Sequence, residues 1–359
     1  PLVSFKFTLV AIVHWFLFGY GLCVLQLNPQ KYLERWFNFY TIPLLGILFF
    51  AWKNHAQYDF RMDASVLVAR PFYFDHAILS ASLLLLLGIY FSKIFIFFRE
   101  KKTIFFTYIQ PFLYAVIVFL LSVGVYLSFS RAAWVSVILA SVIILGIVLF
   151  KFNFKLMLSI SISGIILLGI LTPSLIDTIQ QNKIESKKGN WQQQISSVGN
   201  ITTDASNLER LNRYSCAWRM FQDRPITGFG AGTFPTAFLP YQRKEEMTRI
   251  SVTTVGSQRK GKGGSTHSEY LRALSEMGLL GGMLFLSLLL MSLRSGIRVF
   301  WKGNPSQQIL ALGLLFGLLT FFIHGLFNNF FHQGKIAILI WSSMAILVNL
   351  ERRINIKQE

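Results

Sequence analysis

Long runs of apolar residues dominate this sequence and restrict what it can fold into. The chain has 359 residues, of which 53% are hydrophobic and only 14% are charged. That is too little charge to cover the surface of a soluble domain of this size. An apolar run of about 20 residues is the length that a helix needs to cross a bilayer. We therefore predict an all-α polytopic membrane protein.

Nine segments have the apolar character of a membrane span. They are residues 5–26, 37–52, 73–98, 104–127, 132–150, 155–172, 277–297, 309–328 and 335–350. The second is short for a span, which favours little tilt or a partly re-entrant path. The chain begins with Pro1 in place of a methionine and close to an apolar run, so we expect nine to be a minimum count.

Lysine and arginine residues set the expected orientation. Four short segments between or after the spans contain clusters of these residues: Arg99, Lys101 and Lys102; Lys151 and Lys155; Arg294, Arg298 and Lys302; Arg352, Arg353 and Lys357. Basic residues in short loops face the cytoplasm, and strict alternation of the spans puts all four segments on that one side. The same alternation puts the loop 53–72, the turn Ser128–Arg131 and the long segment 173–276 on the outer side.

The long segment 173–276 divides the chain into three parts. We predict N-terminal transmembrane helices in residues 1–172, a large outer loop in 173–276, and C-terminal helices with a short cytoplasmic tail in 277–359. Basic residues outnumber acidic ones in the loop, and long loops cross a membrane regardless of charge. Membrane phosphates would be natural partners for this excess, and a solvated charged face is the alternative.

Within the outer loop, residues 204–223 have apolar side chains at helical spacing, and Pro225 follows as a stop signal. We predict an amphipathic helix there. The glycine run 228–232 predicts a flexible turn. The polar, basic and glycine-rich stretch 243–265 predicts a mobile segment.

Three motifs could carry chemistry, and the first is the segment Ser128–Trp134. Its Arg131 lies at the outer end of a predicted span. A cation so close to hydrocarbon needs an anion or a water-filled cavity, which makes Arg131 a candidate for binding an anionic substrate. The alternative is an arginine that reaches to lipid headgroups.

The second motif consists of Glu209–Tyr214 and the following Asp223–Gly232. A guanidinium group suits bidentate binding of phosphate oxygens, so Arg210 and Arg213 are candidates for that role. The alternative is an intrahelical ion pair such as Glu209 with Arg213. The glycine run lacks the Lys-Ser/Thr pair of a P-loop and no predicted strand precedes it, so no nucleotide site is expected.

The third motif is Ser265–Leu271, which runs into Glu276–Gly282. His267 stands where the outer loop returns to the membrane, and a histidine titrates close to neutral pH, as a general base requires. A structural hydrogen bond is the alternative for a lone histidine. No grouping of histidine and carboxylate residues has the spacing of metal ligands, so neither a metal nor another cofactor is expected.

Taken in order, these motifs resemble those of the O-antigen ligase and polymerase superfamily, over about residues 70–350. The matching positions are Arg131, Arg210 with Tyr214, Pro225 to Gly230, His267, Leu271, and Glu276 to Gly281. The tract 69–76, which contains Arg70, loosely resembles an earlier arginine motif of the superfamily. Two positions depart from the pattern: Ser268 stands where asparagine is usual, and Ala132 where glycine is common.

The resemblance implies a GT-C-like transmembrane helix bundle with a large, partly helical periplasmic loop, in the bacterial inner membrane. It implies an inverting, metal-independent transfer of a glycan from undecaprenyl diphosphate. Arg131 and Arg210 would stabilise the charge on the departing diphosphate, and His267 would take the proton of the acceptor hydroxyl. The further residues that it suggests for substrate binding are Arg213, Arg70, Tyr214 and Glu276.

The acceptor stays open at this point. A ligase transfers the glycan to lipid A–core, a polymerase transfers it to another lipid-linked glycan, and a related branch glycosylates proteins. We favour the ligase because the loop is long and basic and ends at a single histidine motif. A lipid-linked oligosaccharide transporter is the alternative from another class, and it predicts charge near the middle of the spans, where the sequence has little. Nucleic acid is not an expected partner.

Overall fold

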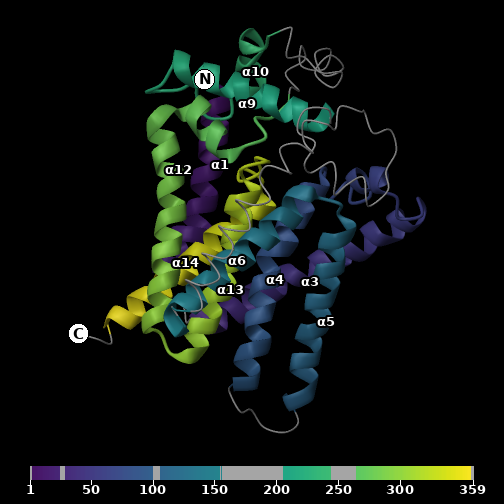
Figure 1. Ribbon diagram of the computed structural model, residues 1–359, viewed down its shortest axis with the longest axis vertical. Coiled ribbons are helices and arrows are strands. Elements are labelled where there is room, and N and C mark those ends of the chain that lie inside the picture. The colour runs from purple at the N-terminus through teal and green to yellow at the C-terminus, as the bar shows by residue number, and fades with distance from the viewer. Residues whose placement is uncertain are drawn as a thin grey trace. The chain divides into compact units, whose positions relative to one another are not determined.

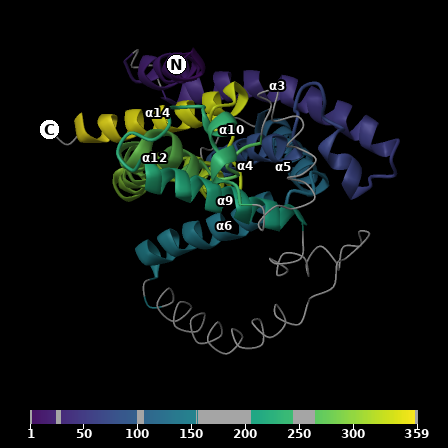
Figure 2. The same ribbon diagram turned by 90° about the horizontal axis from the view of Figure 1, so that it is seen from above.

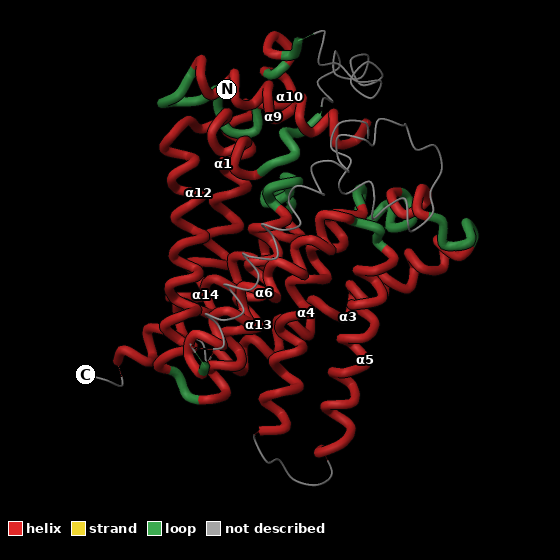
Figure 3. The backbone as a smooth tube through the Cα atoms, in the orientation of Figure 1, coloured by secondary structure: helices red, strands yellow, loops and turns green. Residues whose placement is uncertain are grey.

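The structure, a computed structural model, describes residues 2–24, 29–99, 106–153, 155, 205–243 and 264–356. These residues form helices, turns and loops and contain no strand (Figure 3). In chain order the helices are α1 (Leu2–His14), the π-helix η1 (Trp15–Tyr20), α2 (Gly21–Val24), α3 (Pro29–Ala56), the 3₁₀-helix η2 (Met62–Val66), α4 (His76–Arg99), α5 (Phe106–Leu127), α6 (Arg131–Phe152), α9 (Ala205–Asp223), α10 (Phe234–Ala237), the 3₁₀-helix η3 (Leu239–Tyr241), α12 (Glu269–Lys302), α13 (Pro305–His324) and α14 (Gly334–Ile356).

Seven helical segments of the described residues are long and apolar enough to cross a membrane. They are Leu2–Cys23, His76–Arg99, Ile109–Leu127, Arg131–Phe152, Glu269–Lys302, Pro305–His324 and Gly334–Ile356. The prediction of an all-α polytopic membrane protein is therefore confirmed. The expected span 37–52 lies inside the longer helix α3, which is not among the seven, and the expected span 155–172 lies outside the described residues.

The described chain divides into two compact units. One comprises Lys6–Ile144 and Leu286–Glu359, and is built around α4, whose side chains are mostly buried. Helix α4 packs against both α13 and α5 (Figures 1 and 2). Inside a membrane no hydrophobic driving force brings helices together. Small residues stabilise helix contacts there because they let the main chains approach closely.

Glycines make the contact between α4 and α13 possible. Gly88 lies against Gly313, and a side chain at Gly88 would overlap the main chain of Gly313. One turn further along α4, the Ser92 hydroxyl donates to the carbonyl of Ile309 at 3.0 Å. The two helices are thus held by close main-chain packing together with an interhelical hydrogen bond.

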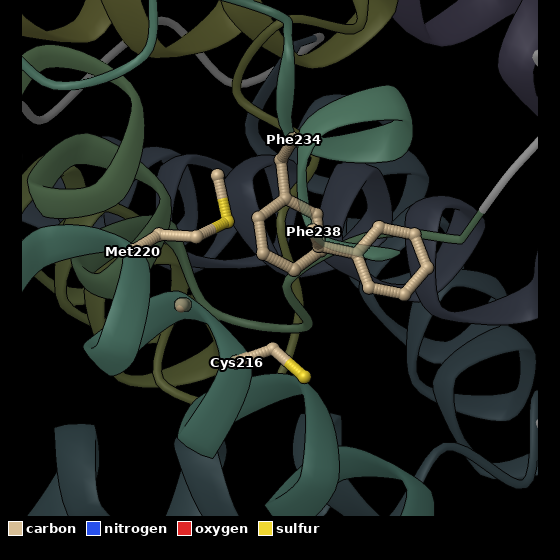
Figure 4. Packing of buried hydrophobic residues seen from close by; sticks show 5 residues of the cluster. Cys216, Met220, Phe234 and Phe238 are labelled. Carbon is tan, nitrogen blue, oxygen red and sulfur yellow. The ribbon is translucent and has the colours of Figure 1, made fainter. Parts of the chain in front are cut away.

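The other unit comprises Pro1–Phe5 and Leu145–Phe285, and includes α9, α10, η3 and the first part of α12. Helix α9 agrees with the amphipathic helix predicted at 204–223, and it lies with α10 at the Glu269 end of α12 (Figure 1). Its buried face packs on the aromatic rings of α10 and of the residue that follows it (Figure 4). The buried core of this cluster consists of Cys216, Ala217, Met220, Phe234 and Phe238.

Helix α12 begins earlier than expected and is broken. It starts at Glu269, whereas the sequence predicted a span from residue 277. Gly278 has φ 66° and ψ −163°, which is not a helical conformation. The predicted boundary between the outer loop and the C-terminal helices, at residues 276 and 277, therefore falls beside this break.

We predict that Gly88→Ala lowers stability by about 1–3 kcal/mol, because the added methyl group must displace the main chain of α13. The thermal unfolding midpoint in detergent measures the effect. Gly46→Ala in α3 is the matched control, since no atom lies within 4 Å of the position of its added methyl group. Equal midpoints for the two variants would contradict this account of the helix contact.

Candidate functional site

The break in α12 leaves main-chain groups without helical partners, and a loop from another part of the chain supplies new ones. The Leu279 amide donates to the carbonyl of Pro225 at 2.7 Å. Only glycine fits at the break, because a side chain at Gly278 would overlap the carbonyl of Ile226, and its positive φ is costly for other residues. A main-chain group without a partner is costly near a membrane, so the loop stabilises the broken helix.

Two further main-chain hydrogen bonds join the loop to the other side of the break. The Phe229 amide donates to the carbonyl of Ser275 at 3.2 Å, and the Gly230 amide donates to the carbonyl of Glu276 at 2.7 Å. We call the loop from Pro225 to Phe234 the docking loop. The sequence singled out its glycines and those after Glu276 as separate motifs, and the structure shows that the two motifs bind each other.

The Glu276 side chain completes this contact. Its carboxylate is buried, with the residue 1% exposed, and accepts hydrogen bonds from the Gly232 amide at 2.8 Å and the Phe234 amide at 3.0 Å. Both carboxylate oxygens are thus engaged by the main chain of the docking loop. The sequence suggested Glu276 as a substrate-binding residue, and the geometry instead favours a role in holding this loop.

The glycine turn predicted to be flexible is held in one conformation. Gly228, Gly230 and Gly232 have φ values of 63°, 105° and 74°, in the left-handed region that favours glycine. A side chain at Gly228 would also overlap the main chain of Glu276. The glycines therefore permit close approach to α12, a role that goes beyond the turn that the sequence predicts. The predicted mobile stretch 243–265 lies mostly outside the described residues.

His267 immediately precedes α12 and has an unusual main chain. Its φ is 54°, a strained value for a residue other than glycine. The hydroxyl of Ser268 accepts a hydrogen bond from the Leu271 amide at 3.4 Å, in the manner of a helix N-cap. The Thr266 hydroxyl donates to the Ser268 carbonyl at 3.0 Å. Polar side chains on both sides of His267 thus fix the turn that presents it.

Tyr214 joins α9 to this turn. Its phenol donates to the His267 carbonyl at 3.2 Å. Burial raises the pKa of the Tyr214 phenol, and the positive charge of Arg210, one turn earlier in α9, opposes that rise. The phenol therefore stays protonated and remains a donor at neutral pH. Tyr214 thus links the turn at His267 to α9, the helix that carries Arg210. We call these three residues the Arg210–Tyr214–His267 cluster.

Arg213 has a different environment from Arg210. The residue is 2% exposed, its Nε donates to a Glu209 carboxylate oxygen at 2.8 Å, and its guanidinium lies 4.1 Å from the centre of the Phe238 ring. This is the intrahelical ion pair named above as the alternative to substrate binding. The geometry assigns Arg213 to the packing of α9 against Phe238.

Arg131 is the first residue of α6 and belongs to the helical unit built around α4. The turn before it is tightly bonded: Phe129 has φ 52°, and the Ser130 hydroxyl accepts from the Ala133 amide at 3.4 Å. Arg131 is partly buried. Arg70, in the same unit, is exposed in the turns before α4.

Residues 116–286 match the family model described as O-antigen ligase. This match supports the resemblance to the O-antigen ligase superfamily that the sequence motifs indicate. Members of this family are membrane enzymes of the glycosyltransferase type, either ligases or polymerases. No curated protein matches the chain.

The O-antigen ligase match runs from α5 into α12, so it includes Arg131, the Arg210–Tyr214–His267 cluster and the α12 break. Among the described residues, no three histidine, cysteine or carboxylate side chains are grouped so that they could hold a metal ion.

The sequence reasoning missed Lys93. This lysine of α4 is buried, donates to the Asn38 side-chain oxygen at 2.6 Å, and lies 4.5 Å from the centre of the Tyr90 ring. No local sequence pattern predicts its contact with Asn38, because Asn38 lies 55 residues away in the chain. A single lysine near a helix end is also ordinary in a membrane protein.

We predict that Glu276→Gln lowers the stability of the protein by about 1.5–3 kcal/mol, the cost of losing a buried hydrogen bond to a charged group. The amide group of glutamine must face either the Gly232 or the Phe234 amide with a donor in place of an acceptor. The thermal unfolding midpoint in detergent measures the loss. A midpoint equal to that of the native chain would show that the carboxylate does not hold the docking loop.

Proposed function

We propose that this protein is an O-antigen ligase that transfers a glycan from undecaprenyl diphosphate to lipid A–core at the periplasmic face of the inner membrane. The observation that carries the proposal is the hydrogen bond from Tyr214, on the helix that carries Arg210, to the strained main chain of His267. Strained conformations at polar sites are typical of functional residues. The cluster lies within the O-antigen ligase match.

The proposed transfer is a single inverting displacement. The acceptor hydroxyl oxygen forms a bond to the anomeric carbon of the donor sugar while the bond from that carbon to the diphosphate oxygen breaks. His267 takes the hydroxyl proton. The electron pair of the breaking bond stays on undecaprenyl diphosphate, which leaves with added negative charge.

Arginines would stabilise the charge that builds on the diphosphate. A guanidinium group binds phosphate oxygens through two parallel hydrogen bonds, and preorganised positive charge is one of the largest contributions to catalysis. We assign this role to Arg210 and Arg131. Arg70 is exposed, and we assign it to binding of the donor. With these arginines supplying the positive charge, the transfer requires no divalent metal.

Tyr214 is proposed to position the base without touching the substrate. Its phenol binds the main chain of His267, so it stabilises the left-handed turn that presents the imidazole. The sequence suggested Tyr214 as a substrate-binding residue. The hydrogen bond supports a positioning role in its place.

The acceptor assignment rests on the long, basic outer loop with its single histidine motif. A polymerase and a protein O-glycosyltransferase would use the same catalytic residues with a different acceptor. A transporter of lipid-linked oligosaccharides would need charged groups along a path through the spans. The buried Lys93 lies within two turns of the Arg99 end of α4, which favours an anchoring role over a place in the middle of such a path.

We predict that His267→Ala and Arg210→Ala each reduce the transfer rate by about 10²-fold or more, since one removes the base and the other the charge on the leaving group. Transfer from purified undecaprenyl-diphosphate glycan in nanodiscs measures the rate. Thr236→Ala, on the exposed surface of α10, is a control that should keep full activity. Full activity of the histidine variant would remove the proposed base.

We predict that Tyr214→Phe lowers kcat about threefold to tenfold and leaves KM unchanged, because the lost hydrogen bond is worth about 0.5–1.5 kcal/mol and acts on the position of His267. Steady-state kinetics with varied donor concentration separates the two constants. A raised KM at constant kcat would show that the phenol binds substrate directly.

Deletion of the gene followed by lipid analysis tests the acceptor. For a ligase we expect full-length polymer to accumulate on its lipid carrier, unattached to lipid A–core, and complementation by the native gene to reverse this. Single repeats in place of polymer would identify a polymerase. Normal lipopolysaccharide with an unglycosylated protein would identify the protein-modifying branch.

A further inference from the structure

The tip of the docking loop is fixed at its main chain and exposed at its side chains. Ile226 is 79% exposed, although the carbonyl before it accepts a hydrogen bond from Leu279 and its own carbonyl lies against Gly278. A large aliphatic side chain held this far from any protein core is unfavourable in water. Ile226 therefore needs an apolar environment that the described protein does not supply.

Exposed apolar side chains on α12 lie on both sides of the break to which the loop is bonded. Met277, Leu279 and Leu280 are 40%, 51% and 60% exposed, and the pattern continues along the helix with Met283 and Leu284 at 52% and 58%. These residues belong to a helix that is long and apolar enough to cross the membrane. Their exposed face is therefore a lipid-facing surface, and the docking loop is fixed at its Glu269 end.

A positive charge adjoins the apolar tip. Arg224 immediately precedes the docking loop and is exposed, and its guanidinium lies 4.6 Å from the centre of the Phe229 ring within that loop. An arginine beside an exposed aliphatic residue is typical of segments that lie in the interface of a bilayer, where the cation binds lipid phosphates and the aliphatic group enters the acyl region.

We propose that residues 224–227 form a membrane anchor, with Ile226 inserted among the acyl chains of the adjacent leaflet and Arg224 at its headgroups. The partner of this anchor is bilayer lipid, because the apolar side chain of Ile226 continues the lipid-facing side of α12 and the positive charge of Arg224 lies beside it. The anchor fixes the depth of the docking loop in the bilayer and, through the α12 break, the depth of His267. This last consequence rests on the proposed function, whereas the anchor itself does not.

A nitroxide spin label at Ile226→Cys tests the anchor in nanodiscs that contain phospholipid and no glycan donor. Cys23 is replaced by serine, and the fully buried Cys216 is kept, with a sample lacking the new cysteine as the labelling blank. Power saturation compares how often the spin label collides with oxygen and with a water-soluble nickel chelate. Oxygen is concentrated in the acyl region. Leu284→Cys serves as the lipid reference and Thr236→Cys as the aqueous reference.

We expect the oxygen-to-nickel ratio at position 226 to match that at position 284 and to exceed that at position 236 several-fold. A ratio equal to that at position 236 overturns the proposal. A ratio that rises only after undecaprenyl-diphosphate glycan is added also overturns it, and identifies the polyprenyl carrier as the occupant. Because the measurement needs no catalysis, a failure here is distinct from a failure of the glycosyltransferase assignment, which the His267→Ala rates test.

Discussion

Main-chain hydrogen bonding at the break in α12 is the constraint on which the rest of the site depends. A helix that crosses a membrane cannot leave amides and carbonyls without partners. At Gly278 the helix nevertheless departs from helical geometry, and the docking loop supplies the partners for Ser275, Glu276 and Leu279. The Glu276 carboxylate adds two hydrogen bonds in the same contact. These main-chain and side-chain hydrogen bonds thus join the docking loop to a transmembrane helix.

These hydrogen bonds explain how the outer loop can hold the proposed catalytic residues at a fixed position relative to the transmembrane helix. On the N-terminal side of the break, the first segment of α12 extends back to its N-cap at Ser268. His267 immediately precedes this N-cap. Helix α9 contacts the same turn through Tyr214, and packs on the docking loop through Met220 and Phe234. The proposed base and the proposed arginine of α9 are therefore fixed to one helix end, and the proposed anchor would set that end at the level of lipid phosphates.

Much of the fold could be predicted from the sequence because the signals are local. Apolar runs gave the membrane class, the spacing of apolar residues gave α9, and the four-residue separation of Glu209 and Arg213 gave their ion pair as an alternative. The α12 break and the role of Glu276 could not be predicted in this way. They depend on hydrogen bonds between residues 42 to 54 positions apart in the chain, from Phe234 with Glu276 to Pro225 with Leu279, and such pairings leave no periodic pattern. For the same reason the glycines at 228–232 predict only a turn, because the local sequence does not identify their partner on α12.

Amide hydrogen exchange of the chain in nanodiscs tests the central claim most directly, because it reports whether the docking loop is bonded to α12. The account predicts that the amides of Phe229, Gly230, Gly232 and Phe234 exchange slowly in the native chain. In Glu276→Gln one of the amides of Gly232 and Phe234, the one that faces the glutamine NH₂ group, should exchange much faster, while those of α4 are unchanged. Rapid exchange of all four amides in the native chain, at the rate of an unstructured peptide, would contradict the account.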